Sequence, residues 1–165
     1  MDLYEHMGKE IFAAHGIPTP GGVVATTPEE ASAACERLGG EAIVKVQVQI
    51  GGRGKGGGVV RVGSPVEAAD AARTMLDGGF NGMRVTRVLV EELLPIAAEF
   101  YAAITLDRSV GMHLAMVTSE GGMDIEQVAR ERPEALRRRY IDPIVGLKPF
   151  QVRYLTDYIA GRYPA

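Results

Sequence analysis

Residues 44–60 read VKVQVQIGGRGKGGGVV, in which alternating apolar and polar residues lead into six glycines and two cations within eight positions. This alternation is typical of a strand, and a second valine-containing strand follows the glycines. Because glycine accepts positive φ and lets another molecule approach the backbone closely, such a loop can direct several N–H groups at one anion. Arg53 and Lys55 add cationic donors that suit a polyphosphate. The stretch predicts two antiparallel strands joined by a candidate phosphate-binding loop.

A solvated, flexible hairpin tip is the alternative for the same loop. The residues match neither a Walker A motif nor a G-x-G-x-x-G turn, because a strand follows the glycines where those motifs place a helix. Lys45 lies upstream between apolar residues, where a lysine is costly to bury without an anionic partner. A bound phosphate would supply such a partner.

Composition limits the class of protein. The 165 residues suffice for one domain or two small lobes, and a net charge of −3 gives no reason to expect a nucleic-acid partner. The single cysteine, Cys35, favours a reducing compartment, and we expect a cytoplasmic location. No apolar run reaches the roughly 18 residues of a membrane span, so no membrane association is expected.

Periodicity and capping residues predict an α+β chain. Asp2 and Glu5 suggest a capping box for a first helix over about 3–15. The same chemistry opens two further helices at Thr27 and Ser64. Further segments are predicted from local pattern, namely strands near 23–26, 84–92, 99–108 and 111–119, a helix from about 124, and a last helix after about 147.

Four blocks of the chain resemble successive blocks of one known family. They are GKEIFAAHGIPTP (8–20), IVKVQVQIGGRGKGGGVV (43–60), VLVEELLPIAAEFYAAITLDR (88–108) and TSEGGMDIEQVARERPEAL (118–136). The chain resembles the β subunits of ADP-forming succinyl-CoA synthetase, and the β subunits of malate-CoA ligase are also similar. The resemblance implies an ATP-grasp fold, incomplete in this chain, with mixed or antiparallel sheets and flanking helices.

The resemblance also implies a division into lobes. Residues 21–93 correspond to the smaller lobe that covers the nucleotide, and residues 1–20 together with 94–165 correspond to part of the second lobe. The C-terminal CoA-ligase domain of the family has no counterpart in the sequence. We therefore expect the N-terminal portion of an ATP-grasp domain.

Carried over residue by residue, the resemblance assigns nucleotide contacts to Lys45, Gly52, Arg53, Gly54, Glu91, Leu94 and Glu99. Lys45 and the loop residues would contact the phosphates. Glu91 would lie beside the base, the backbone of Leu94 would make a contact a few residues farther along, and Glu99 would lie near the nucleotide. From the residues alone, Glu91 could equally be a solvated strand end, and Glu99 could pair with a cation on a neighbouring strand. Pro20 corresponds to a family residue near the base that influences the choice between ATP and GTP, and proline at this position resembles the ATP-using members. The chain departs from the family at Gln49, where histidine is common, and at Ala98, where lysine is common.

In the complete enzymes of this family, a carboxylate, ATP and CoA give acyl-CoA, ADP and phosphate through a phosphohistidine on the α subunit. The resemblance implies an α subunit as partner, with CoA and a dicarboxylate bound through it. The family's magnesium ligands lie in a later E-x-N-P block and a later aspartate, and neither is in this sequence. Because phosphoryl transfer depends on positioning and metal charge, we expect no catalytic residue here and no activity of the chain alone.

Two alternatives to this interpretation remain, of which the first belongs to another functional class. One is a stand-alone or split ATP-binding module without turnover. The other is a different ATP-grasp carboxylate ligase, against which the S-E-G-G block at residues 119–122 argues.

Overall fold

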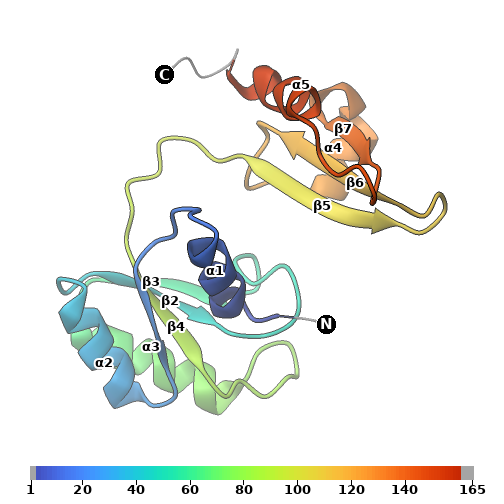
Figure 1. Cartoon of the computed structure of the whole chain (residues 1–165). Helices are drawn as coiled ribbons and strands as arrows, with labels where there is room; N and C mark the ends of the chain where they lie inside the picture. The colour runs from blue at the N-terminus through green and yellow to red at the C-terminus, as the bar shows by residue number, and fades with distance from the viewer. Residues whose placement is uncertain (1–2, 161–165) are drawn as a thin grey trace. The chain divides into compact units, whose positions relative to one another are not determined.

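The computed structural model describes residues 3–160 of the chain. The elements are α1 (Glu5–Ala14), β1 (Gly22–Ala25), α2 (Pro28–Arg37), β2 (Ala42–Val46), β3 (Val59–Val62), α3 (Pro65–Gly78), β4 (Val88–Glu92), β5 (Tyr101–Asp107), β6 (Met112–Thr118), α4 (Ile125–Glu131), a 3₁₀ turn (Pro133–Ala135), β7 (Arg137–Ile141) and α5 (Pro149–Ala160). They divide into two compact units, of which the first ends at Pro95 and the second begins at Ile96 (Figure 1). The predicted α+β class is confirmed.

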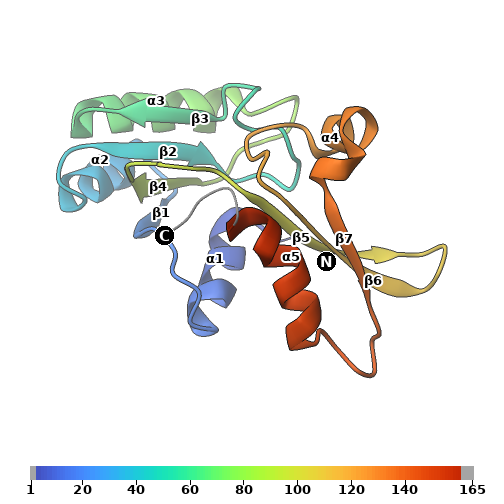
Figure 2. The same ribbon diagram turned by 90° about the horizontal axis from the view of Figure 1, so that it is seen from above.

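The first unit is built on a four-stranded sheet in the order β1-β4-β2-β3, in which every neighbouring pair is antiparallel. Helices α2 and α3 cover one face, and α1 lies against the other (Figures 1 and 2). Successive side chains of a strand point to opposite faces. Val44 and Val46 are therefore in the core with α2 and α3, while Lys45 and Gln47 bond to residues of α1.

Capping hydrogen bonds fix where α2 and α3 begin. The hydroxyls of Thr27 and Ser64 each accept a hydrogen bond, at 3.2 Å, from the backbone N–H groups of Glu30 and Glu67. Both glutamates reach back to the backbone ahead of the helix, which completes the predicted capping boxes. Small alanines on both helices then let them pack closely on each other and on the valines of the sheet.

Helix α1 does not begin as the sequence predicted. The capping box was wrong, because the helix begins at Glu5 after Tyr4, which makes no side-chain cap; Asp2 lies outside the described residues. Ion pairs join α1 to β2 and β4, and α1 belongs to the compact unit that ends at Pro95. The division into lobes, with residues 1–20 grouped with 94–165, stays a prediction.

The second unit contains a three-stranded antiparallel sheet in the order β5-β6-β7. The strands predicted near 99–108 and 111–119 are confirmed as β5 and β6, and they pair as an antiparallel hairpin with Tyr101 opposite Thr118 and Asp107 opposite Met112. Leu155 of α5 packs on Ala115 and on Ile141 of this sheet. Within residues 3–160, no helix is long and apolar enough to cross a membrane.

Candidate functional site

Five charged side chains meet on the face of the first sheet that α1 covers, and we call them the ion cluster: Glu5, Lys9, Lys45, Arg53 and Glu91. Lys45 Nζ lies 2.7 Å from Glu91 Oε1 and 3.2 Å from Glu5 Oε1. Arg53 Nη1 lies 2.7 Å from Glu5 Oε2, and Lys9 pairs with both Glu5 and Glu91. The cluster joins three predicted site residues, Lys45, Arg53 and Glu91, to two residues that the sequence analysis did not select.

The ion cluster is largely shielded from water. Glu91 is only 3% exposed, so the alternative of a solvated strand end is wrong. Buried charges are retained only when they are paired and hydrogen-bonded. Lys45 was expected to need an anionic partner, and in the structure the carboxylates of Glu5 and Glu91 are that partner. Three cations and two carboxylates leave the ion cluster with one net positive charge.

The pKa values of two members reflect these contacts. Burial raises the pKa of the Glu5 carboxyl, but the neighbouring Lys45, Arg53 and Lys9 together outweigh burial and hold this pKa below its ordinary value. Burial lowers the pKa of Lys45, but its bonds to Glu91 and Glu5 outweigh that effect and raise this pKa. Both groups are therefore charged at neutral pH, and Lys45 can act as a fixed cation.

The glycine loop, residues 51–58, is a folded turn. Gly56 N–H donates to Gly52 O at 3.0 Å, and Gly58 N–H donates to Arg53 O at 2.8 Å. Gly57 N–H donates to the Gly54 carbonyl, and Gly52 and Gly57 have positive φ. The carbonyl groups of residues 52–54 accept these bonds, and the N–H groups of residues 52–55 donate none of them. They include the predicted contacts Gly52, Arg53 and Gly54, so these amides can be directed at an anion.

Phe80, which follows α3, packs its ring against Gly56 and Gly58 of the glycine loop. Its ring is 7% exposed and belongs to the core. A Cβ added at Gly56 would come 2.7 Å from Phe80 Cζ, and one added at Gly58 would come 2.8 Å from Phe80 Cε2. Only glycine allows this close approach, so the core fixes the position of the loop.

A matched pair of substitutions tests this support. Gly58→Ala should lower the free energy of unfolding by about 2 kcal/mol, because the new methyl group would overlap Val46 and Phe80. Gly54→Ala, in the same loop, meets no atom within 4 Å and should leave the free energy of unfolding nearly unchanged. Urea denaturation of both variants measures the difference. Equal unfolding midpoints for the two variants would contradict the close contact with Phe80.

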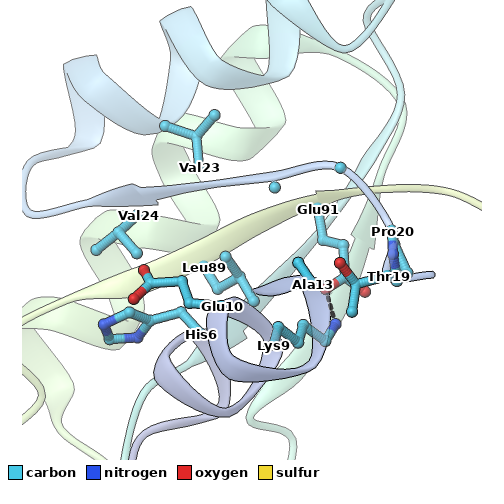
Figure 3. A pocket seen from close by; sticks show the side chains of 12 residues that line it. His6, Lys9, Glu10, Ala13, Thr19, Pro20, Val23, Val24, Leu89 and Glu91 are labelled. Atoms are coloured by element: carbon cyan, nitrogen blue, oxygen red, sulfur yellow. Dashed lines mark hydrogen bonds and ion pairs between the residues drawn. The ribbon is translucent and has the colours of Figure 1, made fainter. Parts of the chain in front are cut away.

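Two cavities are lined in part by residues of the ion cluster. The β1 cavity, of about 570 Å³, is lined by His6, Lys9, Pro20, Val24, Leu89 and Glu91, among others. Figure 3 shows Lys9 and Glu91 joined at one end of it, with Pro20 and Thr19 beside them. The loop cavity, of about 700 Å³, is lined by Glu5, Lys9, Pro20, Gln49, Ile50 and Arg53, among others. Pro20, predicted to lie near the base, therefore borders both cavities.

The other predicted contacts lie farther along the chain. Leu94 follows β4 and is 45% exposed. Glu99 lies in the second unit, where its backbone carbonyl would overlap any Cβ at Gly121 and its Oε2 would lie 2.8 Å from a Cβ at Gly122. The S-E-G-G block thus packs against Glu99. Both residues stay predictions as nucleotide contacts.

Sequence reasoning missed Glu5 and Lys9. Their spacing of four residues on one helix was a visible signal, because it places both side chains on the same face. Their partners on β2 and β4 lie 40 and 82 residues away, which no local pattern reveals.

The described residues contain no cluster of three or more His, Cys, Asp or Glu side chains arranged to hold a metal ion. The two carboxylates of the ion cluster are both paired with cations. This donor set does not fit a divalent cation, and it does fit a polyanion that could compete for the same cations.

Comparisons with known proteins identify the family of the chain. The profile of the ATP-grasp domain family matches residues 2–160. The chain is 50% identical to the β subunit of an ADP-forming succinate–CoA ligase of Rubrobacter xylanophilus, over 94% of this chain and 41% of that protein. It is 46% identical to the β subunit of a GDP-forming succinate–CoA ligase of Thermus thermophilus, with the same coverage. The chain thus spans about two fifths of the length of these relatives.

Solved structures share the fold. A dinucleotide-forming acetyl-coenzyme A synthetase of Candidatus Korarchaeum cryptofilum, in complex with coenzyme A and Ca-AMPCP, matches with a TM-score of 0.71 at 21% identity. The match covers 94% of this chain and 65% of that one. An ATP citrate lyase of Methanothrix soehngenii matches with a TM-score of 0.63 at 16% identity, over 88% of this chain and 36% of that one.

Proposed function

Because the chain belongs to the ATP-grasp domain family, we propose that it binds ATP as the nucleotide-binding part of an ADP-forming acyl-CoA synthetase β subunit. The observation that carries the proposal is the position of two cations, Lys45 on β2 and Arg53 in the glycine loop, which are bridged by the carboxylate of Glu5. Preorganised cations and amides of this kind bind the phosphates of a nucleotide.

In the proposal, the complete enzyme converts a carboxylate, ATP and CoA into acyl-CoA, ADP and phosphate, through a phosphohistidine on an α subunit. The names of the relatives support the substrate class and the β-subunit role. Cytoplasmic location is part of the same proposal, and the buried free thiol of Cys35 supports it.

Each residue of the site has a role in this proposal. Lys45 and Arg53 neutralise the phosphate oxygens, and the amides of residues 52–55 donate to them. The resemblance places Glu91 beside the base, but both of its oxygens are engaged by lysines. Glu91 therefore also fixes the direction of Lys45. The base would lie near Pro20, in one of the two cavities that this residue borders.

Calorimetric titration of the chain with ATP, GTP and adenosine tests the proposal, with and without magnesium. We expect saturable binding of ATP that depends little on magnesium, because the ion cluster does not fit a divalent cation. The absence of saturable heat with ATP at millimolar concentration would overturn the proposal. Equal affinities for ATP and adenosine would also overturn it, because the phosphates would then contribute nothing.

A further inference from the structure

The most unusual contact in the site is made by Glu5, a residue that the family resemblance does not assign to nucleotide binding. Its two carboxylate oxygens together touch three cations, namely Lys9 at 3.1 Å, Lys45 at 3.2 Å and Arg53 at 2.7 Å. Two of these cations are the predicted phosphate contacts. A carboxylate that bridges them occupies the place where phosphate oxygens would bind.

We propose that Glu5 is an internal competitor of the nucleotide, which holds Lys45 and Arg53 until the phosphates of ATP displace its carboxylate. This inference rests on the proposed function. It adds that Glu5 of α1 lowers the affinity for ATP. It also adds that the ion pairs of Glu5 with Lys45 and Arg53 must break when ATP binds.

Charge arithmetic supports the competition. With Glu5 in place, the ion cluster carries one net positive charge, and without that carboxylate it would carry two. A triphosphate is a stronger acceptor of charge-assisted hydrogen bonds than a single carboxylate. Glu91 keeps its pairs with Lys9 and Lys45 after the exchange, so these lysines remain oriented.

The attachment of α1 also suits a contact that can be released. Among the residues of α1, only His6 is buried, and no residue of this helix belongs to the hydrophobic core of the first unit. The helix is held through its charged pairs and through His6, whose backbone N–H donates to Gln47 Oε1 at 3.1 Å. Moving α1 would therefore expose little core surface.

Room for the exchange is present beside the carboxylate. Glu5 and Arg53 both line the loop cavity of about 700 Å³, which lies next to the glycine loop. Phosphates that entered this cavity would meet Arg53 first and would then displace the Glu5 carboxylate from it.

The test compares Glu5→Gln with the control variant Glu36→Gln. Glu36 is an exposed residue of α2, so this control removes one negative charge at a position outside the ion cluster. Glu5→Gln should bind ATP about tenfold more tightly than the parent chain, because the competing carboxylate is gone. Inorganic tripolyphosphate should show the same gain, adenosine should show none, and Glu36→Gln should behave like the parent. Calorimetry measures the affinities of the parent chain and of both variants for ATP, tripolyphosphate and adenosine. Circular dichroism verifies that each variant is folded.

Glu5→Asp provides a second variant that keeps the charge and withdraws the carboxylate by one methylene. It should bind ATP with an affinity between those of the parent and Glu5→Gln. If the parent binds ATP and both Glu5 variants bind it equally or more weakly, Glu5 is a support for the cations and the inference is wrong. If no variant binds ATP or tripolyphosphate, the proposed function itself fails, and this inference fails with it.

Discussion

Replacing Lys45 with methionine should weaken ATP binding by about a hundredfold, because it removes a charge-assisted contact from a shielded site. Methionine keeps an unbranched apolar side chain of similar size on β2 and lacks the ammonium group. The side chain of Lys45 is 16% exposed, so its charge is screened less by water than that of a surface lysine. Calorimetric titration of ATP measures the loss.

Lys55→Met is the matched control for this experiment. Lys55 lies at the exposed tip of the glycine loop, and no ion pair to it is found among the described residues. We expect this variant to lose at most about threefold in ATP affinity, as is usual for an exposed charge. Thermal unfolding of Lys45→Met checks that Glu91, which keeps its pair with Lys9, is still accommodated. Equal losses for the two lysines would contradict the special position of Lys45.

Phe80→Ala should lower the free energy of unfolding by about 3 kcal/mol or more, the largest stability effect that we expect from one substitution in this chain. The ring is 7% exposed and lies against Gly56 and Gly58, whose backbones cannot collapse far into the space it would leave. The loss would combine the removed apolar contacts with a cavity beneath the glycine loop. Urea denaturation followed by circular dichroism measures it.

Phe12→Ala is the control for Phe80→Ala. Phe12 is 51% exposed on α1, so its removal should change the free energy of unfolding by less than about 1 kcal/mol. A loss below about 1 kcal/mol for Phe80→Ala would show that the ring does not support the loop. The prediction of a core-fixed glycine loop would then be wrong.

Local patterns predicted most of the fold. Alternation and a glycine run define β2, the glycine loop and β3, and the hydroxyls of Thr27 and Ser64 mark the starts of α2 and α3. These signals act within about four residues, so they can be recognised without tertiary contacts. The comparisons confirm the ATP-grasp family and the fold that the resemblance implied.

The site was predicted only in part, because its chemistry depends on contacts between distant segments. Lys45, Arg53 and Glu91 were selected, and the structure brings them together. Glu5 was assigned to a capping box, since a carboxylate at the start of a helix satisfies that short-range pattern. In the structure the Glu5 carboxylate instead forms ion pairs with Lys45 on β2 and Arg53 in the glycine loop.

The internal hydrogen bonds of the glycine loop affect when conformational entropy is lost. If the six glycines were in a flexible segment, ordering each of them on ligand binding would cost about 1–2 kcal/mol in backbone conformational entropy. Here, three N–H groups bond within the loop and the Phe80 ring lies against it, so this loss accompanies folding. An incoming nucleotide therefore meets a preordered turn, and more of its interaction free energy is available as affinity.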